Sequence, residues 1–192
     1  KIEDLKHISS NSDLNIAEEI GKLQNKVADE LTDTYSNLNP WQKVQVARHP
    51  DRPQFQDVIE HLIDGYLSLG GDRLFGNDNA LTGGVGYFRG KKVLLLGIDK
   101  GKNTNDRILR NFGMARPEGY RKAIRLMELA NRFNLPVLSF IDTAGAYPGK
   151  GAEERGQAQA IASCIDACLK LKTPMISTIL GEGGSGGAIA LT

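Results

Sequence analysis

Apolar residues recur at steps of three and four along the N-terminal part of the chain. The positions are Ile16, Ile20, Leu23, Val27 and Leu31. This spacing predicts an amphipathic helix, and capping-box residues precede its first turn. A shorter helix is expected to open at Pro40 and to end near Arg48, because a proline follows two residues later. We predict that both helices belong to an N-terminal helical extension, residues 1–53, of a core domain over residues 54–192.

Farther along, helical periodicity gives way to strand-like runs. An apolar helical face is predicted over residues 55–69, where a glycine pair ends it. The runs 83–88 and 92–99 flank an Arg-Gly pair and predict a β-hairpin. Four consecutive apolar residues, Val93 to Leu96, are typical of a strand that is buried on both faces.

The C-terminal half alternates helices and strands. We expect a helix from Pro117 to about Ala130, a strand over 137–141, a helix over 153–171 and a strand over 175–180. Elements alternating at this length predict parallel strands joined by crossover helices, and therefore an α/β fold. In such sheets, ligands bind at the C-terminal ends of the strands.

Charge and composition exclude several classes of partner. The chain carries 24 Lys and Arg against 23 Asp and Glu, a net charge of +1. It therefore lacks the one-signed field of a dedicated nucleic-acid or anionic-membrane binder, and it holds no apolar run long enough to span a bilayer. Glycine is over-represented, at 22 of 192 residues, and much of the excess lies in short loops. This distribution indicates that the backbone itself does chemistry.

The two cysteines, Cys164 and Cys168, are spaced four apart within an apolar helical pattern. We predict that they are reduced core residues and that this chain binds no metal, because no nearby His or Cys would complete a site. Two cysteines are too few for a disulfide scaffold, so a cytoplasmic location is expected, or the plastid stroma if a transit peptide is removed. The chain lacks an initiator Met and stops at Thr192 inside an apolar run, so we expect further residues at its ends.

The loop from Gly181 to Gly187 matches two short motifs. As G-x-G-x-x-G it would cradle the pyrophosphate of a dinucleotide, although that motif normally belongs to the first strand-helix-strand unit of a domain. As G-x-S-x-G it would make Ser185 the nucleophile of a serine hydrolase. All three histidines precede the sheet, however, whereas the hydrolase order places the histidine after the serine. Both remain alternative interpretations.

A third interpretation needs backbone groups only. A glycine-lined loop at a helix N-terminus exposes unpaired N–H groups beside a positive dipole end, and these groups stabilise a developing oxyanion. The loop at residues 145–146 offers the same groups at the end of the preceding strand. The candidate catalytic amides are those of Gly145, Ala146, Gly183, Gly184, Gly186 and Gly187. The structural alternative is that these glycines only permit tight turns and close helix packing.

Several longer motifs follow one another in a fixed order. They are Asn111 to Met114, Pro117 to Ala123, Phe140 to Thr143, Gly145 to Gly149, Ala152 to Gln157 and the loop from Gly181 to Gly187. Together they closely resemble the family of carboxyltransferase α subunits of multisubunit acetyl-CoA carboxylases, and the likeness covers nearly the whole chain. One departure is Ala144, where that family usually has proline, and it puts the rigidity of this loop in question.

The resemblance implies a crotonase-like (ClpP/crotonase) fold and a reaction. The carboxyl group of carboxybiotin, attached to a biotin carboxyl carrier protein, would be transferred to acetyl-CoA, giving malonyl-CoA for fatty-acid synthesis. The implied partners are a homologous carboxyltransferase β subunit, the carrier protein and biotin carboxylase, within an ATP-dependent holoenzyme that contains an α2β2 hetero-oligomer. In this family, a zinc ribbon belongs to the β subunit.

Eight basic residues lie close together in the otherwise neutral sequence. They are Lys100, Lys102, Arg107, Arg110, Arg116, Arg121, Lys122 and Arg125. The candidates for substrate binding are Lys100, Arg116 and Arg121, which would contact CoA phosphates, the carrier protein or an acidic subunit, together with Tyr147 of the matching motif. The alternative is a solvated helix face with local ion pairs, such as Glu118 with Lys122.

Overall fold

The computed structural model describes residues 17–192, and the chain divides into a unit that ends at Gln45 and a unit from Val46 to Thr192. Helix α2 (Ala17–Ser36) is the predicted amphipathic helix, although its expected first position, Ile16, lies outside the described residues. Helix α3 (Pro40–Ala47) begins at the predicted proline. Its first turn is closed by a capping box, in which the Asn39 Oδ1 atom accepts the Gln42 N–H at 2.9 Å.

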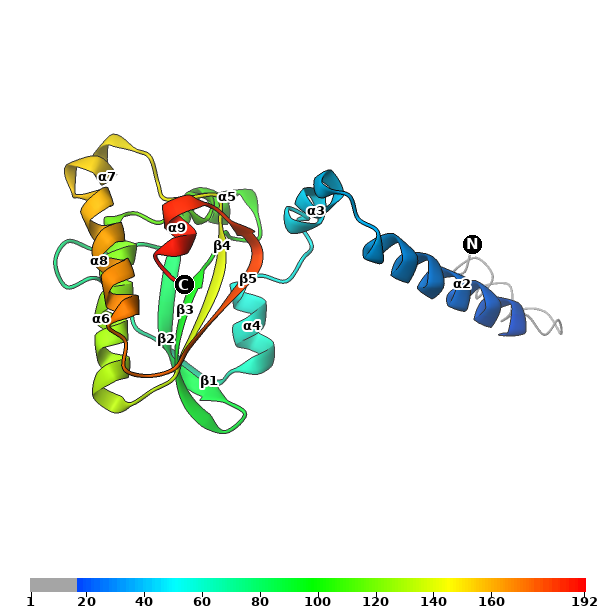
Figure 1. Cartoon of the computed structure of the whole chain (residues 1–192), viewed down its shortest axis with the longest axis horizontal. Coiled ribbons are helices and arrows are strands. Elements are labelled where there is room, and N and C mark those ends of the chain that lie inside the picture. Colours follow the sequence, from blue (N-terminus) through cyan, green and yellow to red (C-terminus); the bar gives the residue numbers. More distant parts are fainter. Residues whose placement is uncertain (1–16) are drawn as a thin grey trace. The chain divides into compact units, whose positions relative to one another are not determined.

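The second unit is built on a five-stranded sheet with the order β1-β2-β3-β4-β5 (Figure 1). The strands are β1 (Asp64–Ser68), β2 (Leu81–Phe88), β3 (Lys91–Ile98), β4 (Val137–Thr143) and β5 (Met175–Gly183). Strands β1 to β3 are antiparallel, and β3, β4 and β5 run parallel. The predicted hairpin is confirmed. Arg89 and Gly90 both have positive φ, 49° and 76°, as a type I′ turn requires.

Helices cover both faces of this sheet. They are α4 (Phe55–Leu62), α5 (Thr104–Leu109), the 3-10 turn η1 (Asn111–Gly113), α6 (Pro117–Phe133), α7 (Lys150–Glu154), α8 (Gln157–Leu169) and α9 (Ser185–Ile189). Helices α6 and α8 lie side by side on one face, and α4 lies on the other (Figure 1). Leu94 and Leu96 of β3 belong to the core beneath α6, whereas Val93 and Leu95 pack with Phe55 of α4. Strand β3 is therefore buried on both faces, as predicted.

Two predicted helices have different bounds in the structure. The helix expected over 55–69 ends at Leu62, and residues 64–68 form β1 instead. Gly65 adopts a left-handed φ of +58°, which a helix cannot contain, and the apolar side chains on either side of it reach the core from a strand just as well. The helix expected over 153–171 is two helices, α7 and α8, because Gly156 also has a left-handed φ, +78°.

Other differences lie at the ends of elements. Strand β5 continues to Gly183, so the glycine-rich loop is shorter than predicted and passes directly into α9. Helix α5 and the turn η1 carry no clear periodicity, and the sequence did not predict them. The expected boundary at 53/54 stays a prediction, although Arg48 and Arg52, which it assigns to the extension, form ion pairs with the end of the sheet. Within residues 17–192, no helix combines the length and the apolar character needed to cross a membrane.

Candidate active site

The two glycine loops singled out in the sequence meet where β4 and β5 end. A side chain at Gly184 would overlap the backbone of Ala144, and a Cβ atom at Gly187 would lie 2.7 Å from the Gly145 carbonyl carbon and 2.8 Å from the Ala146 nitrogen. Glycine is therefore required at positions 184 and 187, because backbone packs directly against backbone there. The sequence placed both loops at neighbouring strand ends, and the structure brings them into contact.

Some of the candidate amides are already used inside the protein. The Gly184 N–H donates to the Thr143 carbonyl at 2.8 Å, and the Gly145 N–H donates to Thr143 Oγ1 at 3.1 Å. The hydroxyl of Thr143 in turn donates to the Gly145 carbonyl at 2.7 Å, which fixes the start of the loop. The N–H groups of Gly145 and Gly184 therefore fix the loops, and Gly183 lies within β5 opposite Thr143, so the role of these three as oxyanion donors stays a prediction.

Other amides remain available in this arrangement. Among residues 17–192, no acceptor pairs with the N–H groups of Ala146, Ser185, Gly186 or Gly187. The last three belong to the first turn of α9, whose N–H groups have no partner within the helix. Ala146 and Gly186 are partly exposed, whereas Gly187 is buried against the other loop. Ala146 and Gly186 thus offer amide donors from two strand ends.

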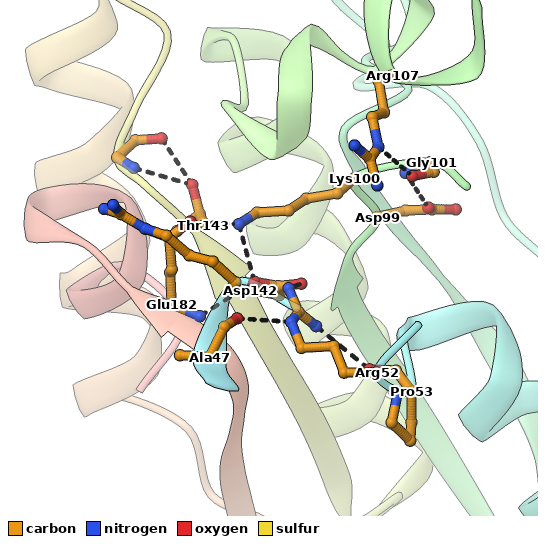
Figure 2. Close-up of polar contacts among 12 residues, drawn as sticks. Ala47, Arg52, Pro53, Asp99, Lys100, Gly101, Arg107, Asp142, Thr143 and Glu182 are labelled. Atoms are coloured by element: carbon orange, nitrogen blue, oxygen red, sulfur yellow. Dashed lines mark hydrogen bonds and ion pairs between the residues drawn. The ribbon is translucent and has the colours of Figure 1, made fainter. Parts of the chain in front are cut away.

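A charged cluster lies at the base of both loops (Figure 2). We call it the Lys100 cluster, and it consists of Lys100, Asp142, Glu182, Arg48 and Arg52. The Lys100 ammonium contacts Asp142 Oδ1 at 3.0 Å and Glu182 Oε2 at 2.6 Å. Arg52 pairs with Asp142, and Arg48 Nε contacts Glu182 Oε1 at 2.8 Å. The hydrogen bond from Lys100, followed by that from Arg48, lowers the pKa of Glu182 although burial opposes the shift.

The sequence missed most of this cluster. Asp142 and Glu182 each follow an apolar run at the C-terminal end of a parallel strand, and this position is the signal that would have found them. The Asp142 Oδ1 atom also accepts the Glu182 N–H at 3.0 Å, so the two carboxylates are joined through backbone as well. A cavity of about 230 Å³ opens beside the cluster and is bordered by Arg107 and Ala144.

The predicted substrate-binding residues divide into two groups. Arg116 and Tyr147 are brought together, since the Arg116 guanidinium lies 4.8 Å from the centre of the Tyr147 ring. Lys100 is committed to its two carboxylates, and its side chain is only 16% exposed. Arg121 donates to Asp72 Oδ2 at 2.8 Å and to the Arg155 carbonyl at 3.1 Å. Lys100 and Arg121 are therefore engaged within this chain, which argues against a substrate contact, and their assignment as substrate-binding residues stays a prediction.

The ion pair between Glu118 and Lys122, which the alternative of a solvated helix face included, is not formed. Glu118 pairs with Arg155, and the Lys122 ammonium donates to Asn77 Oδ1 at 2.8 Å and to the Asp78 carbonyl at 2.7 Å. Burial lowers the pKa of Lys122 to about 8. The helix face that carries Lys122 is not solvated, because the loop before β2 covers it.

The two cysteines are free thiols in the core, as predicted. Cys164 is buried, and its thiol donates to the Ala190 carbonyl at 3.0 Å. The thiol of Cys168 approaches the same carbonyl at 3.5 Å. In the described part of the chain, no three His, Cys, Asp or Glu side chains converge on a point where they would hold a metal ion.

The geometry gives little support to the two motif-based alternatives. Ser185 has the positive φ, 54°, of a strained turn, but within residues 17–192 no hydrogen bond joins its side chain to a histidine. The Nδ1 atoms of His49 and His61 face the backbone of Asp51 and Asp57, and His7 lies outside the described residues. Two of the three glycines of the dinucleotide motif are explained without a dinucleotide. Gly181 leaves room for the side chains of Arg52 and Asp142, and Gly183 lies within β5.

Comparisons with known proteins identify relatives along the whole chain. Residues 1–192 match the model of the acetyl co-enzyme A carboxylase carboxyltransferase-like family. The acetyl-coenzyme A carboxylase carboxyl transferase subunit alpha of Rhodospirillum centenum is 56% identical over 191 residues, which cover 100% of this chain and 60% of the relative. Its counterpart from Beijerinckia indica is 57% identical over 192 residues, which cover 100% of this chain and 61% of the relative. The chain thus spans about three fifths of these relatives.

Solved structures show the fold. The β subunit of Pseudomonas aeruginosa geranyl-CoA carboxylase is similar with a TM-score of 0.61 at 20% identity, over 78% of this chain and 26% of that one. The transcarboxylase 12S hexamer with hydrolysed methylmalonyl-coenzyme A is similar with a TM-score of 0.63 at 19% identity, over 77% and 27%. The α/β fold of this chain is thus that of crotonase-like carboxyltransferases. On the match along its whole length, the chain belongs to the acetyl co-enzyme A carboxylase carboxyltransferase-like family.

Proposed function

We propose that this chain supplies the α part of an acetyl-CoA carboxylase carboxyltransferase. The protein transfers a carboxyl group from carboxybiotin, attached to a biotin carboxyl carrier protein, to acetyl-CoA and so produces malonyl-CoA. The observation that carries the proposal is the pair of unpaired amide donors, at Ala146 and Gly186, on two contacting loops at adjacent parallel strand ends. Family membership supports carboxyl transfer as the reaction that such donors would serve.

The chemistry explains why amides suffice. Loss of the carboxyl group leaves negative charge on the ureido oxygen of biotin, and removal of a proton from acetyl-CoA leaves negative charge on the thioester oxygen. Each oxyanion is stabilised by preorganised N–H donors, and removal of one such donor costs about 10²–10³ in rate in other enzymes. The free ureido nitrogen accepts the proton, so a catalytic histidine is not needed.

The proposal includes partners and a compartment. We expect the amides of this chain to face biotin and a homologous β subunit to supply most of the CoA site, in an α2β2 assembly that also works with biotin carboxylase. Arg116 and Tyr147, which stack beside the loop, are the remaining candidates in this chain for contact with substrate or carrier. The reaction would take place in a bacterial cytoplasm or a plastid stroma.

A reconstitution experiment tests the function. This chain is mixed with a candidate β subunit, and malonyl-CoA-dependent carboxylation of free biotin is measured. The mixture is expected to be active and the isolated chain nearly inactive. Gly187→Ala should lower the rate by about 10²-fold or more, because its Cβ would push the two loops apart. Gly21→Ala is the matched control, since nothing lies within 4 Å of a Cβ at that position.

Two outcomes would contradict the proposal. The first is a mixture that carboxylates no biotin although both chains are folded. The second is an ester or thioester hydrolase activity that disappears in Ser185→Ala, which would assign the loop to a nucleophilic serine. In the amide interpretation, Ser185→Ala keeps its carboxylation rate, because the Ser185 side chain is exposed and only backbone groups act.

A further inference from the structure

One ammonium group connects three parallel strands. Lys100 follows the end of β3 by two residues, and its Nζ atom reaches Asp142 in β4 and Glu182 in β5 at 3.0 and 2.6 Å (Figure 2). Asp142 is followed directly by Thr143 and the first amide loop. Glu182 is followed directly by the glycines that lead into α9. The same cation thus touches the base of both loops that carry the candidate donors.

The surroundings of Lys100 are built to hold it there. A Cβ atom at Gly113 would lie 2.6 Å from Lys100 Cγ, so the turn η1 leaves room for the lysine stem only because residue 113 is a glycine. The Asp142 side chain is 2% exposed, and that of Glu182 is 19% exposed. Water screens such contacts weakly, so the ammonium is a firm link rather than a surface ion pair.

The link cannot be replaced by the neighbouring arginines. All three guanidinium nitrogens of Arg52 are engaged, by Asp142 and by the carbonyls of Ala47 and Pro53. Among residues 17–192, the Arg48 side chain forms an ion pair with Glu182 alone, and it is 59% exposed. Lys100 is therefore the one member of the cluster that contacts both carboxylates. Without it, the carboxylates of Asp142 and Glu182 would face each other with less compensating charge.

We propose that Lys100 is a positioning residue: by joining Asp142 to Glu182, it fixes the two amide loops relative to each other and so aims their free N–H groups at a common reaction centre. The consequence for catalysis rests on the function proposed above. The consequence for loop geometry does not. Lys100 makes no contact with substrate and transfers no proton.

Hydrogen exchange of the full chain tests the geometric half. The amides of Glu182 and Gly184 report on the loops directly, because they donate to Asp142 Oδ1 and to the Thr143 carbonyl. Lys100→Met should speed their exchange by about tenfold or more, and Lys100→Arg should restore protection, since a guanidinium also contacts two carboxylates. Lys102→Met is the matched control. Lys102 pairs with Asp57 at 2.5 Å on the exposed surface and touches neither loop.

Kinetics of the chain assembled with its β subunit test the catalytic half. Lys100→Met should lower kcat for biotin carboxylation by about tenfold to 10²-fold while KM for malonyl-CoA stays within about threefold, because donors that act in the transition state are misaimed. Lys100→Arg should recover most of kcat. A merely structural lysine would lower stability without this division between kcat and KM.

Each outcome decides the matter. Unchanged exchange at Glu182 and Gly184 in folded Lys100→Met overturns the proposal, whatever the activity. A tenfold rise in KM with kcat intact also overturns it, because Lys100 would then bind substrate. If the wild-type assembly carboxylates no biotin, the proposed function fails, and the exchange experiment still decides whether Lys100 sets the loops. If Lys100→Met fails to fold, Lys100→Gln is measured in its place.

Discussion

Two charged clusters at the same end of the sheet contain similar residues but have different roles. In the Lys100 cluster, the carboxylates are part of β4 and β5 and precede the amide loops. In the second cluster, basic side chains of α6 hold the loop of residues 69–78, with Arg121 on Asp72, Lys122 on Asn77 and Asp78, and Arg125 on the carbonyls of Leu69 and Gly71. The first cluster organises a site, and the second closes a loop.

The difference lies in what the carboxylates hold. Asp72 accepts the N–H groups of Leu74, Phe75 and Gly76 at 2.8–3.0 Å, in addition to Arg121. Although burial opposes it, these donors lower the pKa of Asp72 well below its usual value. The carboxylate oxygens of Asp72 are therefore taken by the loop itself and by Arg121. Basic charge near a strand end is thus no sign of substrate binding until its partners are known.

The largest effects should separate the clusters. Asp142→Asn should reduce kcat of the assembled enzyme by about 10²-fold, because a misplacement of about 1 Å in reacting groups costs that much. Asp72→Asn should leave kcat per folded molecule within about threefold. It should lower the free energy of unfolding by about 3–5 kcal/mol, as expected when a buried ion pair loses one partner.

Steady-state kinetics and urea unfolding of both variants check this contrast. Arg121→Lys is a milder control for the second cluster. It keeps a positive charge beside Asp72 but loses the fixed geometry of the guanidinium. A large loss of kcat in folded Asp72→Asn would mean that the loop of residues 69–78 takes part in the reaction. The comparison would then be wrong.

A smaller effect concerns the pH dependence of stability in the second cluster. Burial lowers the pKa of Lys122 to about 8 from an unfolded value of 10.5. Between these pH values the unfolded chain binds more protons than the folded one, so Lys122 makes the protein more stable as pH rises from 8 to 10.5. The free energy of unfolding of Lys122→Met should lack this rise of a few kcal/mol, so its curve against pH should diverge from the wild-type curve over this range.

Thermal or urea unfolding at several pH values measures those curves. Lys92→Met, on the exposed part of the hairpin, is the control for the loss of any lysine. Parallel curves for wild type and Lys122→Met over this range would show that the Lys122 ammonium is not held in a low-dielectric site.

The Lys100 cluster should respond to acid rather than to base. The pKa of Glu182 is lowered from 4.5 by Lys100 and Arg48, so the folded state binds its proton less readily than the unfolded state. The stability that Glu182 contributes is therefore complete above about pH 4.5 and is lost as pH falls through the lower folded value. In Glu182→Gln, the free energy of unfolding should fall less steeply with acid below about pH 4.5. Above that pH, its dependence on pH should be nearly that of the wild type. An unchanged loss of stability in acid would contradict the pairing of Glu182 with Lys100 and Arg48.

The sequence predicted the parts of the fold that a single periodicity determines. The hairpin, α6, β4 and the burial of Val93 to Leu96 on both faces followed from residue patterns alone. It misassigned residues 64–68, because Ile63 and Tyr66 fit the core both from a helix and from a strand, and pairing with β2 decides between them. Propensity along the chain cannot show such a pairing.

The site was predictable in outline only. Glycine-rich loops after two apolar runs revealed where backbone donors would lie. Which N–H groups remain free depends on Thr143, whose carbonyl and hydroxyl take those of Gly184 and Gly145. The carboxylates that Lys100 contacts lie 42 and 82 positions farther along the chain, and Asp72 lies 49 positions before Arg121, so no local pattern identifies these pairs.

The smallest predicted effect concerns Ala144, the position at which the sequence was expected to depart from the family it resembles. Thr143 is the last residue of β4 and has an extended backbone, which is the conformation that a following proline favours. Among residues 17–192, the N–H of Ala144 has no hydrogen-bond acceptor, so replacing Ala144 by proline would remove no hydrogen bond. Ala144→Pro should therefore raise the free energy of unfolding by about 0.4–1 kcal/mol through a more restricted unfolded chain, and it should leave kcat unchanged or slightly higher. A lower stability on urea unfolding would show that the φ of Ala144, next to Gly184, is one that proline cannot adopt, and that the two loops are packed differently here from those of the related subunits.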